Sequence, residues 1–196
     1  MHDTHGMAKI EIPARSEHEL LRICQAEELA RSAHAGMCRP NRARQPCVEH
    51  LAEVAALVME AGGSVEAVTA AWLHDIVEDT VITLAEIRQR FGEAVCELVD
   101  GLTDPPRSAE LPLGQRKLAQ ARRLASRCRQ TRLVKLADQY SNVRSVLSDP
   151  PLDWDEAKCR EYVQGAVGIA RVCGGVAPWL DRRFERLLVE GGYRGR

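Results

Sequence analysis

The sequence predicts an all-α protein folded as a single domain of eight to ten helices. Apolar residues recur with helical spacing through most of the 196 residues, and no segment alternates polar and apolar residues for long enough to form a strand. Aromatic residues make up only 4% of the chain, and β-branched runs are rare, which disfavours sheets. The length suits one packed domain and is short for two.

The N-terminal half is predicted to form five helices, each with a start or stop signal. Residues 1–15 are expected to be a flexible segment without a signal peptide, and residues 16–196 to form the domain. Ser16 and Thr83 each begin a capping-box pattern, and Ser64 caps the central helix. An Arg- and Pro-rich loop separates the first two helices, and a Gly pair ends the second. The predicted helices cover residues 17–35, 49–61, 65–76, 84–90 and 93–102.

The C-terminal half is predicted to begin with a loop. Residues 103–114 hold three Pro and one Gly, and they are the segment in which flexibility is most expected. Two helices are predicted over 115–126 and 129–148, followed by a turn at Asp149–Pro151. A cap at residues 153–156 begins a helix that reaches about residue 170, and the last helix begins near residue 177.

Composition excludes several classes of protein. The 27 basic and 28 acidic residues give a net charge of -1, so nothing indicates a nucleic-acid partner. No apolar run approaches the roughly 20 residues that span a bilayer, so no membrane partner is expected. The seven Cys are scattered and form no CxxC pair, which is typical of free thiols in a reducing cytoplasm.

The strongest local signal is the segment AWLHDIVEDT at residues 71–80. Glu78 and Asp79 follow His74 and Asp75 by four residues, so we expect all four to lie on one helix face, one turn apart. Carboxylates beside apolar residues are costly unless a cation or hydrogen bonds compensate them. The segment therefore indicates a metal site. The alternative is a solvated charged patch at a helix end, with His74 as a cap.

Two distant residues complete a donor set with this segment. His50 lies at the start of the second helix, and Asp138 lies late in the KLAD segment of residues 135–138. Two nitrogen and two oxygen donors suit Mn²⁺, Fe²⁺ or Zn²⁺, with positions left open for water and substrate. Taken alone, His50 is as well explained as a helix-start residue, and Asp138 as an acid on a helix face.

The order H…HDxxED…KLADxxxN resembles the metal-dependent HD phosphohydrolases, and among them the RelA/SpoT-type alarmone hydrolase domain. The small stand-alone Mesh class is most similar, with matching blocks from about Cys24 to about Gly174. The resemblance implies a single HD-domain helical bundle. It also implies one divalent ion, with Mn²⁺ expected, and a nucleotide substrate. Oligomeric state is left open.

The resemblance also implies roles for individual residues. His50, His74, Asp75 and Asp138 would hold the metal, and Glu78 and Asp79 would orient and activate the attacking water. The substrate-binding positions would be Arg39 on the base, Asn142 and Tyr162 on the sugar and phosphates, and Arg116 and Lys117 near the entrance. His34 is interpreted as structural, because the family's ligand is the His of the next helix.

The chain departs from the family around the base pocket. Met37, Pro40 and Cys47 stand where the family has Gln, Lys and Tyr, and Leu51 replaces a Pro. Gln139 and Ser141 replace an Arg and an aromatic or His residue inside the KLAD block. The reaction expected is hydrolysis of guanosine 3′,5′-bis(diphosphate) to GDP and pyrophosphate by a metal-activated water, with GTP as the product from the analogue that carries a 5′ triphosphate. The alternatives are a phosphohydrolase acting on another nucleotide, such as the NADPH 2′-phosphate, or a non-catalytic nucleotide-binding module.

Overall fold

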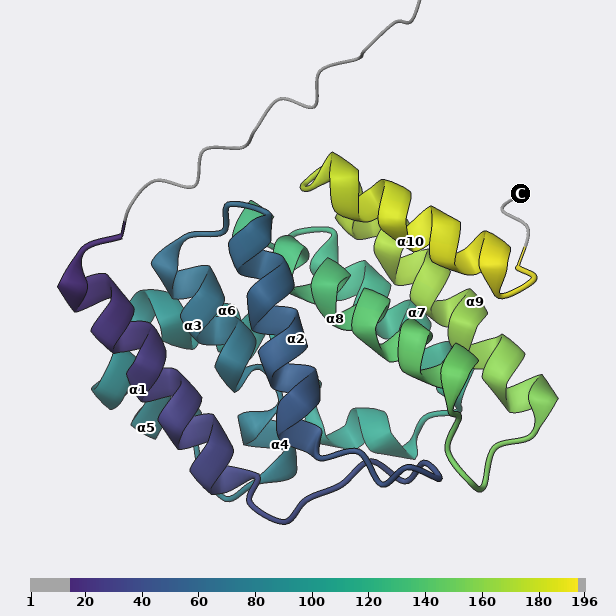
Figure 1. The fold of residues 1–196 in the computed structure, drawn as a ribbon, viewed down its shortest axis with the longest axis horizontal. Coiled ribbons are helices and arrows are strands. Elements are labelled where there is room, and N and C mark those ends of the chain that lie inside the picture. Colours follow the sequence, from purple (N-terminus) through teal and green to yellow (C-terminus); the bar gives the residue numbers. More distant parts are fainter. Residues whose placement is uncertain (1–14, 194–196) are drawn as a thin grey trace, which may run out of the picture.

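The computed structural model describes residues 15–193, which contain ten α-helices and one 3₁₀ helix (Figure 1). The all-α prediction is confirmed, because the only β contacts within that range are two isolated bridges, Cys38–Pro46 and Asn41–Pro151. The N-terminal segment expected to be flexible lies, apart from Arg15, outside the described residues. The elements are α1 (Glu17–Ala33), α2 (Cys47–Glu60), α3 (Val65–Leu73), α4 (Ile76–Asp79), α5 (Leu84–Phe91), α6 (Glu93–Leu102), the 3₁₀ helix η1 (Pro106–Glu110), α7 (Leu113–Leu124), α8 (Arg129–Ser148), α9 (Glu156–Cys173) and α10 (Pro178–Glu190).

The predicted helix starts have the hydrogen bonds that their sequences indicate. The Ser16 hydroxyl accepts from the N–H of Glu19 at 3.3 Å, and the Glu19 carboxylate accepts from the N–H of Ser16 at 2.7 Å. Thr83 and Glu86 make the same reciprocal pair at the start of α5. These bonds satisfy N–H groups that the first turn of a helix leaves free.

Helix α3 forms the centre of the bundle. Every residue of α3 except Glu66 is buried. The helix packs against α1, α2, α6 and α8, so apolar residues cover its whole circumference. Leu73 ends it and His74 follows immediately, so the best-packed element of the fold positions the HD pair.

Helix α8 carries polar side chains into the core. Twelve of its 20 residues are buried, including Lys135, Asp138, Gln139 and Ser141. α8 contacts α2, α3 and α6 on one side and α9 and α10 on the other, and Figure 1 shows it beside α2 in the middle of the molecule. Buried polar groups are costly unless they are hydrogen-bonded, so these residues must be partners of one another or of a ligand.

Two predicted segments differ from the structure. The third helix ends at Leu73 instead of Ile76, and the four-residue helix α4 follows it. The Nδ1 atom of His74 lies 2.8 Å from the carbonyl oxygen of Ala71. In a continuing helix that carbonyl would accept a hydrogen bond from a backbone N–H of the next turn. The predicted loop 103–114 contains η1, which the 2.8 Å bond from Ser108 N–H to the Pro105 carbonyl closes. No helix within residues 15–193 is long and apolar enough to cross a membrane.

Candidate metal centre and active site

The fold brings the four predicted ligand residues together from three places in the sequence. His50 lies in the first turn of α2, His74 and Asp75 form the junction between α3 and α4, and Asp138 lies in the middle of α8. His50, His74 and Asp138 are buried, whereas the Asp75 side chain is 34% exposed. The packing of α2, α3 and α8 therefore determines where these groups meet.

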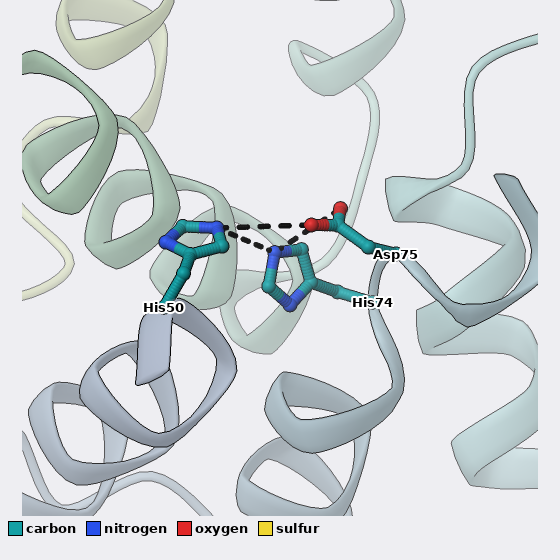
Figure 2. Close-up of side chains that lie close together, drawn as sticks. All are labelled: His50, His74 and Asp75. Atoms are coloured by element: carbon teal, nitrogen blue, oxygen red, sulfur yellow. Dashed lines mark hydrogen bonds and ion pairs between the residues drawn. The ribbon is translucent and has the colours of Figure 1, made fainter. Parts of the chain in front are cut away.

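The donor atoms of His50, His74 and Asp75 face one another (Figure 2). The two Nε2 atoms of His50 and His74 are 3.3 Å apart, and an Asp75 oxygen lies 3.2 Å from His74 Nε2 and another 3.7 Å from His50 Nε2. One ligand atom from each of these three residues lies within 4.8 Å of the others, so the group could hold a metal ion. Asp138 Oδ1 is 3.4 Å from His50 Nε2 and 3.8 Å from His74 Nε2.

The hydrogen bonds of the far ring nitrogens show that this group fits a cation. Nδ1 of His74 faces the Ala71 carbonyl, which only accepts, so the proton of His74 is on Nδ1. Nδ1 of His50 lies 2.8 Å from the Ser141 hydroxyl, which donates its own proton to Glu53 Oε2 at 2.6 Å. His50 therefore also carries its proton on Nδ1. Both Nε2 atoms present lone pairs to one another and to carboxylate oxygens, an arrangement that a divalent ion stabilises.

Asp138 is ionised by its surroundings. Burial alone would raise the pKa of Asp138, but the ammonium of Lys135, 2.9 Å from Oδ2, holds that pKa well below its usual range. Gln139 also donates to Oδ2 at 2.9 Å, and Asn142 donates to Oδ1. Burial lowers the pKa of His50, which keeps its imidazole neutral and available as a ligand.

The two predicted water-activating acids point in different directions. Both follow in α4, but Glu78 Oε1 accepts from the backbone N–H of Asp104 at 2.8 Å, whereas Asp79 Oδ2 lies 3.8 Å from His34 Nε2. The expectation that His74, Asp75, Glu78 and Asp79 share one helix face is wrong, because the helix breaks at His74 and Asp75. Only Asp75 and Asp79 line the cavity beside the histidines.

Both acids hold a proton more tightly than free side chains do. Partial desolvation of the Glu78 carboxyl group raises its pKa to about 7, and the negative charge of Asp75 adds to this effect, although the residue as a whole is exposed. Burial and the Asp75 charge also raise the pKa of Asp79. A carboxylate with a pKa raised toward neutral is a stronger base and is suited to removing a proton from water.

A cavity of about 260 Å³ opens next to the cluster. It is lined by ten residues from the segment between α1 and α2, α2 itself, the α3–α4 junction, α4 and α8: His34, Cys38, Arg39, Pro40, Cys47, His50, Leu51, Asp75, Asp79 and Asn142. Arg39 donates to Asn142 Oδ1 at 2.8 Å, and Asn142 in turn bonds Asp138. The predicted substrate residues Arg39 and Asn142 are thus linked to the metal cluster.

The other predicted substrate residues lie away from this cavity. Tyr162, on α9, packs its ring against Trp154, with centroids 5.1 Å apart. The Lys117 ammonium lies 4.1 Å from the centre of the Tyr162 ring and donates to Gln139 Oε1 at 3.0 Å. Arg116, its neighbour on α7, is partly exposed and does not line this cavity.

The expected position of Lys117 at the entrance is wrong. Its side chain is only 5% exposed, because its stem crosses Gly165 at the tight contact between α7 and α9. Burial, with the charge of Lys135, lowers the pKa of Lys117 to about 7. Lys117 is therefore connected to the cluster through the protein interior, by way of Gln139 and Asp138, and not from the solvent side.

The sequence analysis missed the residues that support the cluster. Lys135 and Gln139 hold Asp138, and Ser141 with Glu53 holds His50. Arg144 pairs with Glu53 at 2.8 Å and completes this chain of contacts. The three-residue spacing of Lys135 and Asp138 on one helix could have indicated the first contact. No sequence signal links Glu53 of α2 to Ser141 of α8, which are 88 positions apart.

Comparison with known proteins agrees with this architecture. A family model described as "HD domain" matches residues 26–162. A Xenopus tropicalis protein named guanosine-3′,5′-bis(diphosphate) 3′-pyrophosphohydrolase MESH1 is 30% identical over 87% of this chain and 94% of its own length. The Escherichia coli bifunctional (p)ppGpp synthase/hydrolase SpoT is 34% identical over 69% of this chain, which covers 19% of that longer protein.

Solved structures show the same fold. The structure of a metazoan ortholog of SpoT, described as hydrolysing ppGpp, superposes with a TM-score of 0.81 at 24% identity and covers 92% of this chain. The match accounts for 98% of that structure, so the two folds correspond along nearly their whole length. Together with the match to the family model and the identity to the Xenopus protein, this shows that the chain belongs to the HD-domain family and is a relative of the small MESH1 hydrolases.

Proposed function

We propose that this chain hydrolyses guanosine 3′,5′-bis(diphosphate) at its 3′ position, releasing pyrophosphate and leaving GDP. The analogue with a 5′ triphosphate would leave GTP. The observation that supports this most directly is the pair of Nε2 lone pairs, 3.3 Å apart and flanked by Asp75, beside a cavity that also contains Asp79 and Arg39. The relatives that match most of this chain's length are named for that reaction.

The proposed metal ligands are His50, His74, Asp75 and Asp138, and the proposed ion is Mn²⁺. When bound, a divalent ion supplies Lewis acidity, which polarises a phosphoryl oxygen and acidifies a water molecule. Two neutral imidazoles and two carboxylates suit Mn²⁺, which accepts mixed nitrogen and oxygen donors. The hydrogen bonds of Ser141 and Ala71 to the two Nδ1 atoms keep both rings in the tautomer that ligation requires.

The residues around the cavity would carry out the remaining steps. Asp79 faces the cavity beside Asp75 and takes the proton of the attacking water, because its raised pKa makes it a competent base. Glu78, held by the Asp104 N–H outside this cavity, would act on the water only indirectly, through the effect of its charge on Asp75. Arg39, held by Asn142, places a cation at the cavity wall, where it would bind phosphate or base.

Two observations favour a second candidate, a phosphohydrolase of a related nucleotide such as the NADPH 2′-phosphate. Cys47 lines the cavity where the resembling enzymes have an aromatic residue, and the Arg39 guanidinium already bonds Asn142. Both features reduce the specific contacts available to a guanine base. The metal cluster would serve either substrate, so the two candidates differ in specificity rather than in chemistry.

A substrate panel assayed with the Mn²⁺-loaded protein tests the proposal. We expect release of pyrophosphate from guanosine 3′,5′-bis(diphosphate) and loss of that release in His74→Ala, whose circular dichroism spectrum should match the wild type. Release of orthophosphate from NADPH, without pyrophosphate release from the alarmone, would support the second candidate. Parallel loading with Fe²⁺ and Zn²⁺ tests the choice of Mn²⁺. No hydrolysis of any substrate would indicate a binding module.

The proposed domain organisation and location accompany this function. We propose that residues 16–196 form one hydrolase domain, since α1, α2, α6, α9 and α10 contact α3 or α8, and α5 and α7 join them through α6 and α9. A cytoplasmic location stays a prediction from the seven unpaired Cys.

A further inference from the structure

One buried ring nitrogen beside the proposed base makes no hydrogen bond within the described structure. His34 follows the last residue of α1 and is 2% exposed. Its Nδ1 lies 2.9 Å from the Ala30 carbonyl oxygen, which only accepts, so the proton of a neutral His34 is on Nδ1. Its Nε2 is buried, and no donor within residues 15–193 bonds it. A buried polar atom without a partner is uncommon and calls for an explanation.

The unpartnered atom faces Asp79. Nε2 of His34 lies 3.8 Å from Asp79 Oδ2, and both residues line the cavity beside the metal cluster. His34 is outside the group of His50, His74 and Asp75 whose donor atoms converge, so it is not placed as a ligand. Its role as the end residue of α1 uses only Nδ1 and leaves Nε2 unexplained.

We infer that His34 is a positioning residue that stabilises Asp79 in its protonated form. When Asp79 takes a proton from the attacking water, its carboxyl group becomes an O–H donor, and the lone pair of His34 Nε2 is ready to accept that hydrogen bond. The proton leaves the water oxygen and stays on Asp79, the imidazole remains neutral, and Asp79 later releases the proton to solvent through the cavity. This inference rests on the proposed function, because it assigns a partner to the proposed base.

The contact between His34 and Asp79 is more favourable after the proton transfer than before it. Before transfer, two acceptors face each other and repel. After transfer, a donor faces an acceptor 3.8 Å away, and the half-exposed Asp79 side chain would have to move closer to form a normal hydrogen bond. Groups that are better paired in the transition state than in the ground state accelerate the chemical step. His34 is therefore expected to act on kcat and not on substrate binding.

His34→Asn separates this role from the helix-end role. An Asn amide reaches the position of Nδ1 and can still donate to the Ala30 carbonyl, but it places nothing at Nε2. We expect kcat to fall by about 10-fold or more, a fraction of the full contribution of a general base, with KM within about twofold. Mn²⁺ content and melting temperature should match the wild type. An Asn variant with wild-type kcat would overturn the inference while leaving the proposed function intact.

Double variants identify the residue through which His34 acts. In an Asp79→Asn background, His34→Asn should cause no further loss, because the partner of Nε2 is already absent. In a Glu78→Gln background it should cause the same loss as in the wild type, since Glu78 bonds Asp104 and does not face His34. Equal further losses in both backgrounds would show a general structural effect and would overturn the inference.

Nitrogen NMR of the metal-free protein tests the contact between His34 and Asp79 without an activity assay. With its imidazole neutral, His34 should show a protonated Nδ1, which faces the Ala30 carbonyl, and an unprotonated Nε2. The Nε2 resonance should move in Asp79→Asn, whose amide can donate to it, and should stay in place in Glu78→Gln. An unchanged resonance in Asp79→Asn would overturn the inference. If no substrate is hydrolysed, the proposed function fails, and this measurement still decides whether His34 and Asp79 are partners.

Discussion

Substituting Ser141 by alanine is expected to weaken Mn²⁺ binding by about 10- to 100-fold, the range typical for losing a partner of a metal-ligating histidine. The Ser141 hydroxyl accepts from Nδ1 of His50 at 2.8 Å and donates to Glu53 at 2.6 Å. Without it, nothing holds the proton of His50 on Nδ1. The ring can then place its proton on Nε2, the atom that would ligate the metal.

The magnitude follows from the burial of the contact. His50 is 5% exposed and Ser141 is 3% exposed, so water does not freely replace the lost hydroxyl. An unpaired buried N–H costs about 1–3 kcal/mol, which matches the roughly 1.4–2.7 kcal/mol of a 10- to 100-fold change in Kd. Glu53 keeps its ion pair with Arg144 at 2.8 Å, so the substitution leaves no second group unpaired.

Calorimetric titration of the metal-free protein with Mn²⁺ measures this change. Ser148→Ala is the matched control, because Ser148 is an exposed serine on the same helix whose hydroxyl bonds only the Ser145 carbonyl. Glu53→Gln should weaken binding less than Ser141→Ala, since its amide oxygen still accepts from Ser141. Wild-type affinity in Ser141→Ala would refute the reasoning that this hydroxyl holds the His50 ligand in place.

Three further predictions concern other parts of the molecule. Desolvation raises the pKa of Glu78 to about 7, so the metal-free fold loses stability as pH rises from about 4.5 to 7 and this side chain must ionise. Glu78→Gln removes the ionisation, and it should therefore raise the melting temperature at about pH 8 but not at about pH 4. Gly165→Ala should lower the free energy of unfolding in denaturant by about 1–3 kcal/mol, because a Cβ at this position would lie 2.6 Å from Cγ and 2.7 Å from Cβ of Lys117. Gly168→Ala is the control on the same helix: its Cβ meets open space, so it should be neutral or stabilising. Arg39→Ala should raise KM more than it lowers kcat. The wild type should discriminate guanosine from adenosine substrates by less than about 10⁴-fold, and a larger ratio would show that backbone groups of the 36–48 loop read the guanine edge.

Much of the fold could be predicted because its signals are local. Ser16, Ser64 and Thr83 start helices in the sequence analysis and in the structure, since a capping hydroxyl bonds an N–H only three residues away. The end of the central helix was predicted less well. The apolar stripe continues to Ile76, but the carbonyl of Ala71 bonds the His74 side chain, and side-chain competition of this kind leaves no mark on periodicity.

The sequence by itself determined the all-α fold and the residues that could act as donors. Helical spacing and caps depend on contacts between residues three or four positions apart. The pairs His74–Asp75 and Glu78–Asp79 lie within one stretch of ten residues, so their pattern can be read directly from the sequence. The protein's family is also visible at this level, because its motifs appear in order along the chain. None of these signals depends on how the helices pack.

Only the tertiary structure decided what each of those residues faces. It separated Asp79, beside His34, from Glu78, beside Asp104, and it buried Lys117 beneath Tyr162 instead of placing it at the entrance. It also joined His50 to Glu53 through Ser141, across two helices. The physical reason is that proton positions and pKa values depend on the burial and the partners of single atoms. Those partners come from packing between α1, α2, α4 and α8, over separations along the chain at which sequence spacing carries no geometric information.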